Sequence, residues 1–132
     1  PYRCEDAELV IVTSGTTSST ARMAVDALRD AGTAAGMINV RLFRPFPGEL
    51  LAAAIGDAPK VAVVDRNLSV GLGGVFAQEL RAALYGRDKQ PGIFGFVTGL
   101  GGGDITPDSV RAMAEYALEE KAPADNEPVW WK

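Results

Sequence analysis

Short apolar runs alternate along this chain with segments of helical periodicity, and this alternation constrains the fold more than any other feature. The runs cover residues 8–13, 37–43, 60–65 and 92–97. Short apolar runs of this kind, bounded by turn residues, are typical of strands that are buried on both faces. Strand–helix units with short connections predict a parallel sheet that carries helices on both of its faces.

The intervening segments supply the helices of this pattern. Helices are predicted over residues 20–31, 48–55, 74–84 and 106–121. Thr106 is a good N-cap for the last of them, and Pro107 suits its first helical position. We expect a single α/β domain over residues 1–121, followed by a tail over residues 122–132. The few residues before Glu8 are too short for a helix but could add an edge strand.

The composition excludes several classes of function. The 132 residues carry a formal net charge of −4 and no run of Lys or Arg, whereas nucleic-acid binding needs clustered cations. No apolar run approaches the roughly 20 residues that span a bilayer, and no signal peptide is visible. Cys4 is the single cysteine, so no internal disulfide forms and a reducing, cytoplasmic setting is expected.

The chain contains no histidine, which removes the commonest general base and the commonest metal ligand. A Ser-His-Asp triad, a Cys-His pair and an ordinary zinc site are therefore impossible. We expect no catalytic residue and no metal ligand in this chain. The chemistry of any parent enzyme would be carried by a cofactor or by another polypeptide segment.

Polar and glycine-rich segments follow the predicted strands at their carboxyl ends, where the binding crevice of a parallel sheet lies. They are Ser14-Gly15-Thr16, Arg44-Pro45, Asp65-Arg66-Asn67 and residues 99–104. The first segment, which is rich in Ser and Thr, either cradles an anion at a helix N-terminus or simply caps that helix through Ser18 or Ser19. It is not a Walker A motif, because no Gly-Lys-Ser/Thr follows it.

The glycines at positions 71, 73 and 74 do not make a dinucleotide-binding fingerprint, because Ala77 stands near the position of the third glycine. The second predicted strand also ends in Phe43-Arg44 rather than in an acidic residue that would hold a ribose. We expect these glycines to permit tight turns and close packing of a helix on the sheet.

Two arginines at strand ends are candidate anion-binding groups. Arg44 stands on a stiff scaffold of two prolines and is either a projecting cation or a structural residue of the sheet edge. Arg66 either forms an ion pair with Asp65 or reaches a phosphate or carboxylate. In the tail, Trp130 and Trp131 would bury a large area against the same chain or against a partner.

Four segments carry a resemblance to a known family. They read E-L-V-I-V-T-S-G, R-L-F-R-P-F-P, V-A-V-V-D-R-N-L-S-V-G-L-G-G and G-L-G-G-G-D-I-T-P-D. In order and spacing they resemble core domain II of pyruvate:ferredoxin/flavodoxin oxidoreductases, a domain in the α subunit of 2-oxoacid:ferredoxin oxidoreductases. The resemblance covers residues 7–120. Gly103 stands where the family often has an arginine, so any anion contact of that arginine is lost or moved.

This resemblance implies a fold similar to the transketolase C-terminal domain, a three-layer α/β/α sandwich around a mostly parallel five-stranded sheet. It also implies a parent enzyme that oxidatively decarboxylates a 2-oxoacid such as pyruvate to an acyl-coenzyme A. That enzyme would use thiamine diphosphate and iron–sulfur clusters and would pass electrons to ferredoxin or flavodoxin. One cysteine cannot ligate a four-iron cluster, and the resemblance implies that the thiamine-binding domains lie elsewhere in the complex. We therefore expect the chain alone to bind none of these cofactors.

The expected role is that of a non-catalytic assembly module whose strand-end loops pack against other domains or subunits. The candidates for coenzyme A or interface contacts are Arg44, Arg66, Ser69, Gly99, Gly101, Gly102 and Asp104. On this interpretation the chain is an excised domain of an α subunit or a short natural subunit. The alternatives are a stand-alone anion- or nucleotide-binding module, or the C-terminal domain of a transketolase-like or 2-oxoacid dehydrogenase enzyme.

Overall fold

The secondary structure follows the alternation of the sequence. A computed structural model describes residues 2–14, 17–40, 48–65, 68–69, 73–85, 91–97, 106–119 and 129–130. The strands are β1 (Leu9–Ser14), β2 (Ala35–Val40), β3 (Lys60–Asp65), β4 (Leu68–Ser69), β5 (Gly73–Gly74), β6 (Gly92–Val97) and β7 (Val129–Trp130). The helices are α1 (Thr17–Asp30), α2 (Gly48–Ile55), α3 (Val75–Leu84) and α4 (Pro107–Glu119).

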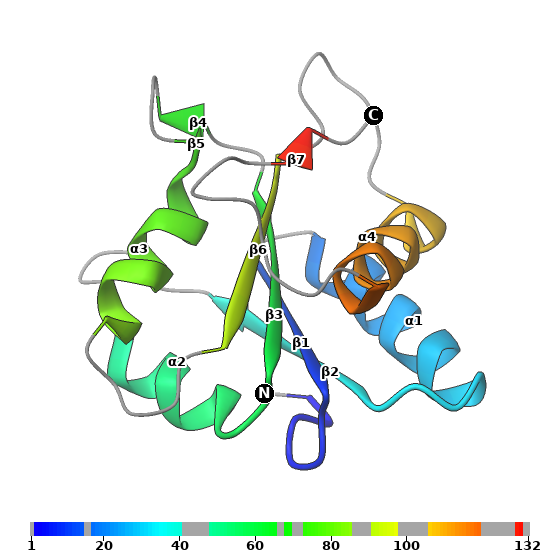
Figure 1. Ribbon diagram of the computed structural model, residues 1–132. Helices are drawn as coiled ribbons and strands as arrows, with labels where there is room; N and C mark the ends of the chain where they lie inside the picture. Colours follow the sequence, from blue (N-terminus) through cyan, green and yellow to red (C-terminus); the bar gives the residue numbers. More distant parts are fainter. Residues whose placement is uncertain are drawn as a thin grey trace.

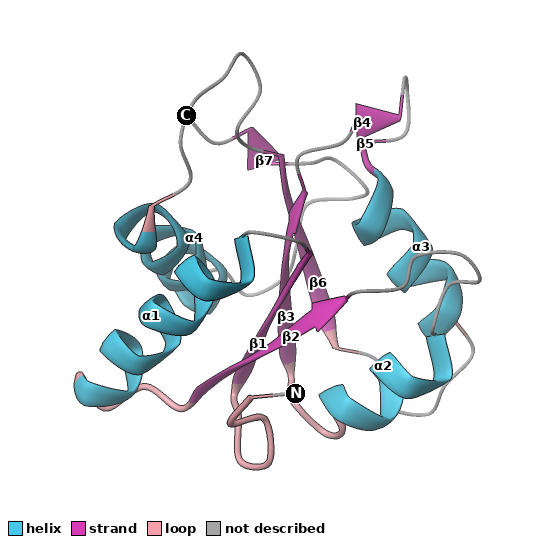
Figure 2. Cartoon of the chain, turned by 180° about the vertical axis from the view of Figure 1, so that it is seen from behind, coloured by secondary structure: helices cyan, strands magenta, loops and turns pink. Residues whose placement is uncertain are grey.

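Five strands form one sheet in the order β2-β1-β3-β6-β7, and every neighbouring pair in it is parallel. Strands β4 and β5 form a separate antiparallel pair. In Figures 1 and 2, α1 and α4 cover one face of the sheet, whereas α2 and α3 cover the other. The predicted three-layer α/β/α sandwich is therefore confirmed.

The clearest differences from the expected elements concern β2, α1 and the edges of the sheet. Strand β2 begins at Ala35 rather than at Met37, because pairing with β1 stabilises an extended backbone that Ala and Gly do not favour alone. Helix α1 begins at Thr17 rather than at Thr20, since Ser and Thr suit the start of a helix. Within the described residues, β7 of the tail adds the strand beyond β6, whereas Tyr2 makes only an isolated antiparallel bridge on β2.

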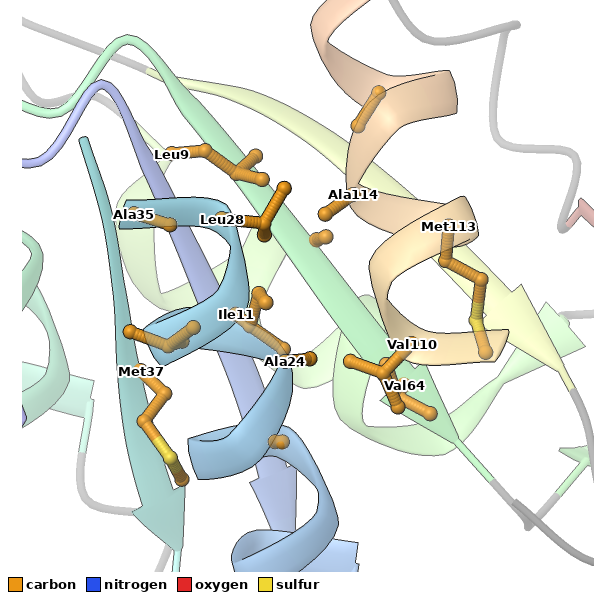
Figure 3. Close-up of a cluster of buried hydrophobic side chains, with 14 of the residues drawn as sticks. Leu9, Ile11, Ala24, Leu28, Ala35, Met37, Val64, Val110, Met113 and Ala114 are labelled. Atoms are coloured by element: carbon orange, nitrogen blue, oxygen red, sulfur yellow. The ribbon is translucent and has the colours of Figure 1, made fainter. Parts of the chain in front are cut away.

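Alternate residues of the central strands point to opposite faces of the sheet, and both sets are apolar. In β1, Leu9 and Ile11 belong to the cluster that α1 and α4 cover. Val10 and Val12 belong to the cluster that α2 and α3 cover. Figure 3 shows the first cluster, in which Met113 of α4 lies over the sheet. This burial on both faces explains why the strands read as continuous apolar runs.

The N-terminal segment lies against the outer side of β2. The backbones of Tyr2 and Met37 exchange two hydrogen bonds of 2.8 and 2.9 Å. Gly36 permits this approach, because a Cβ at that position would lie 2.7 Å from the carbonyl oxygen of Arg3. The guanidinium of Arg29 in α1 donates to the same carbonyl oxygen over 2.6 Å. The segment is therefore an integral part of the β2 edge.

Lys60 ties the first residue of β3 to the end of α4. Its ammonium Nζ donates to the carbonyl oxygens of Ala117 and Leu118 at 2.8 Å each. It also lies 5.8 Å from the centre of the Phe94 ring. A cation on the last carbonyl groups of a helix satisfies acceptors that have no partner within the helix and opposes the negative end of the helix dipole.

We expect Lys60→Met to destabilise the fold. Methionine keeps an unbranched apolar stem but removes both charge-assisted hydrogen bonds, so the free energy of unfolding should fall by about 1–3 kcal/mol. Urea denaturation of the wild type and the variant measures this difference. The control is Arg111→Met, which removes an exposed cation paired with Glu115 at 3.0 Å on the outside of α4 and should cost less than about 0.5 kcal/mol. Equal effects of the two substitutions would contradict the capping role.

Candidate functional site

The carboxyl edge of the sheet is the candidate site. Because the strands are parallel, β1, β2, β3 and β6 all end at this edge, and each is followed along the chain by a helix. The chain passes from β1 to β2 on one side and then returns across β1 to β3 on the other. Ligands of doubly wound sheets bind outside the carboxyl ends of the strands, at such a reversal of strand order.

The predicted site residues follow the strands that end at this edge, but most of them lie outside the described residues. Ser69 is described, and it pairs with Gly73 across the short β4–β5 ladder. The candidates outside the described residues are Arg44, Arg66, Gly99, Gly101, Gly102 and Asp104. Residues 41–47 follow β2, residues 66–67 follow β3 and residues 98–105 follow β6. The contacts of the six candidates therefore stay predictions.

Two polar residues at the carboxyl edge were not predicted as site residues from the sequence. Thr13 of β1 and Asn39 of β2 stand opposite each other in the parallel register. Thr13 is only 2% exposed, and neither its Oγ1 nor the Oδ1 of Asn39 has a hydrogen-bond partner. The signal was a polar residue within or at the end of a largely apolar strand, which the apolar periodicity alone does not mark as functional.

A pocket of about 650 Å³ lies at the opposite, amino edge, between residues 3–7 and residues 53–58. Cys4 lines it, and its Sγ lies 3.3 Å from the carbonyl oxygen of Met37, to which the thiol donates. Burial raises the pKa of the Cys4 thiol, so the reactive thiolate is disfavoured there. The structure therefore does not favour Cys4 as a nucleophile in this pocket.

The charged residues near this pocket fasten the N-terminal segment to α1. Arg29 holds the carboxylate of Asp6 with two hydrogen bonds, the shorter of 2.7 Å. Asp26 accepts hydrogen bonds from the Tyr2 hydroxyl at 2.7 Å and from Arg3 at 3.3 Å. The Arg29 hydrogen bond lowers the pKa of Asp6, and the Tyr2 hydrogen bond is the largest cause of the lowered pKa of Asp26.

The described part of the chain lacks two common features of functional sites and of membrane proteins. Within the described ranges, no group of three Cys, Asp or Glu side chains could hold a metal ion. The sequence has no histidine. Among the described helices, none has both the length and the apolar character needed to cross a bilayer. At the carboxyl edge lie polar atoms without hydrogen-bond partners and the starts of helices. This arrangement suits the binding of a ligand or partner.

Comparison with known sequences gives a consistent set of relatives. The sequence pattern of the family described as pyruvate:ferredoxin oxidoreductase core domain II matches residues 7–110. Pyruvate synthase subunit PorA of Methanothermobacter thermautotrophicus is 48% identical over 112 residues, which are 85% of this chain and 28% of that protein. Ketoisovalerate oxidoreductase subunit VorA of Pyrococcus furiosus is 36% identical over 129 residues, which are 96% of this chain and 33% of that protein.

A third relative is the NADH-dependent phenylglyoxylate dehydrogenase subunit alpha of Aromatoleum evansii, which is 36% identical over 132 residues. The match covers 98% of this chain and 32% of that protein, so the chain spans about a third of the length of these relatives. Among solved structures, the split gene transketolase, inactive beta4 tetramer, has a TM-score of 0.68 at 22% identity, covering 89% of this chain and 41% of that one. This likeness shows a shared fold.

Acid should weaken the attachment of the N-terminal segment. Because the pKa values of Asp6 and Asp26 lie below those of the unfolded chain, their stabilisation is complete above about pH 4 and is lost as the pH falls through the lowered values. Urea denaturation between neutral pH and about pH 2 measures the loss. The double variant Asp6→Asn/Asp26→Asn should lose less stability over this range than the wild type. A parallel loss in the two proteins would show that these carboxylates do not contribute.

Proposed function

Because this chain belongs to the pyruvate:ferredoxin oxidoreductase core domain II family, we propose that it is a non-catalytic assembly module of a 2-oxoacid oxidoreductase. The observation that carries this proposal is the extent of the match. It covers most of this chain but only about a third of each relative. The described residues also hold no metal-ligand cluster of Cys, Asp and Glu. In this proposal the reacting groups belong to other parts of the enzyme.

The parent reaction in this proposal is the oxidative decarboxylation of a 2-oxoacid to an acyl-coenzyme A. The names of the three relatives point to pyruvate, ketoisovalerate and phenylglyoxylate, which share a 2-oxoacid group and differ in the rest of the molecule. Relatives whose names point to such different acids all contain a segment similar to this chain. In this proposal the segment therefore contributes to the architecture that these enzymes share. We infer that the choice of acid is made by other domains.

The ligands that an iron–sulfur cluster needs are not found among the described residues. An iron–sulfur cluster needs several thiolates, whereas Cys4 is the single cysteine and its thiol donates to backbone carbonyl groups. Arg29 holds the carboxylate of Asp6 in the N-terminal segment, and Tyr2 and Arg3 hold that of Asp26 in α1. In this proposal, thiamine diphosphate, iron–sulfur clusters and electron transfer to ferredoxin or flavodoxin belong to the rest of the enzyme.

The carboxyl edge is the proposed docking surface of the module. Strands β1, β2, β3 and β6 end there, and the predicted contact residues follow these strand ends in the sequence. In this proposal Arg44, Arg66 and the glycine segment at residues 99–103 contact a neighbouring domain, a subunit or coenzyme A. A guanidinium suits these roles because its fork of donors matches a phosphate or a carboxylate.

Separate Arg44→Ala and Arg66→Ala substitutions in the full enzyme test this docking role. Loss of a charge-assisted contact should weaken coenzyme A binding or subunit association by about tenfold or more, since such a contact contributes about 1.5–3 kcal/mol. Titration calorimetry and sedimentation measure the two affinities, and steady-state assays measure turnover. Arg111→Ala on the exposed side of α4 is the control and should change none of them. Unchanged affinities and turnover in both test variants would refute the proposal.

A further inference from the structure

We propose that Thr13 and Asn39 form the floor of a phosphate-binding site at the carboxyl edge of the sheet, beside the start of α1. The site lies in the described part of the chain and is independent of the assembly role proposed above. It develops the anion-binding alternative that the sequence leaves open for the start of this helix.

The strand register places both side chains on the same face of the sheet. Thr13 follows Leu9 and Ile11 in alternation, and these two residues lie in the cluster that α1 and α4 cover. Asn39 follows Ala35 and Met37 in the same way on the neighbouring strand. Because Thr13 and Asn39 are direct partners in this register, their side chains are neighbours on the face that α1 covers.

Each of the two side chains carries one oxygen atom that is shielded from water and has no hydrogen-bond partner. Thr13 is 2% exposed, and its Oγ1 and the Oδ1 of Asn39 are buried without a partner. A buried polar group without a partner costs about 1–3 kcal/mol, and such groups are few in folded proteins. A ligand that accepts a hydrogen bond from the Thr13 hydroxyl and from the Asn39 NH₂, after rotation of the amide, would remove this cost at both side chains.

The surroundings favour an anion with several oxygen atoms. The Thr13 hydroxyl can donate, and the Asn39 amide offers either its oxygen or its NH₂ after a rotation. Helix α1 begins at Thr17, close after Thr13, and no acidic side chain stands in its first turn. The positive end of the helix dipole is therefore not neutralised within that turn, and helix N-termini of this kind bind phosphate.

The position in the fold agrees with this chemistry. Thr13 lies near the end of β1, next to the point where the strand order reverses between β1 and β3. Ligands of doubly wound sheets bind at this point. On the amino side, Ile11 and Met37 are buried in the core, so a phosphate group approaches from the carboxyl edge.

The test measures phosphate binding in the full-length protein that carries this chain. Thermal melting and titration calorimetry use inorganic phosphate, and in a second arm coenzyme A, at an ionic strength matched with chloride. The wild type should bind a probe and melt at a higher temperature. Thr13→Val and Asn39→Leu should weaken that binding by about tenfold or more, since each removes a hydrogen bond to a charged group. Binding of inorganic phosphate indicates a free anion, whereas binding of coenzyme A alone indicates the phosphate of a larger molecule, and either result supports the site.

Two further variants separate binding from folding. Thr13→Ser keeps the hydroxyl and should retain phosphate binding. Thr33→Val makes the same chemical change as Thr13→Val, but beyond the far end of α1, and should also retain phosphate binding. Without ligand, Thr13→Val should be at least as stable as the wild type, because a methyl group replaces an unpartnered hydroxyl. The proposal is overturned if neither probe binds the wild type or if Thr13→Val and Asn39→Leu both keep wild-type affinity. It is also overturned if Thr13→Val melts at a lower temperature than the wild type without ligand.

Discussion

Burial of the parallel sheet on both faces is the constraint on which the rest of this structure depends. Parallel strands need crossover connections, and the crossover helices must cover both faces to remove the apolar side chains from water. Here Leu9 and Ile11 face one helical layer, whereas Val10 and Val12 face the other. Polar chemistry is thereby left to the two edges at which the strands begin and end.

The two edges differ in how their polar groups are satisfied. At the amino edge, Arg29 bonds to Asp6 and to the backbone of the N-terminal segment, and Lys60 caps α4. At the carboxyl edge, Thr13 and Asn39 carry buried atoms without partners, and the helices begin there. Among the described residues, buried polar atoms without partners are therefore found at the carboxyl edge, and binding is proposed there.

Periodicity predicted the elements whose apolar pattern is uninterrupted, and the bounds of α2, β3 and β6 agree with the structure. It misplaced the start of β2, because Ala35 and Gly36 take a strand conformation only through pairing with β1. It also missed Thr13 and Asn39, since only the register of two strands brings them together. Of the predicted site residues, only Ser69 lies within the described residues, so the roles of the arginines and the glycine segment stay predictions.

Hydrogen exchange in the complete enzyme, compared before and after dissociation into its parts, tests most directly whether the carboxyl edge faces the rest of the assembly. The account predicts that assembly slows exchange at the strand ends and helix starts, in residues 13–19 and 39–40, while residues 3–7 and 53–58 at the amino edge exchange as before. Protection confined to the amino edge, with the carboxyl edge unchanged, would contradict it.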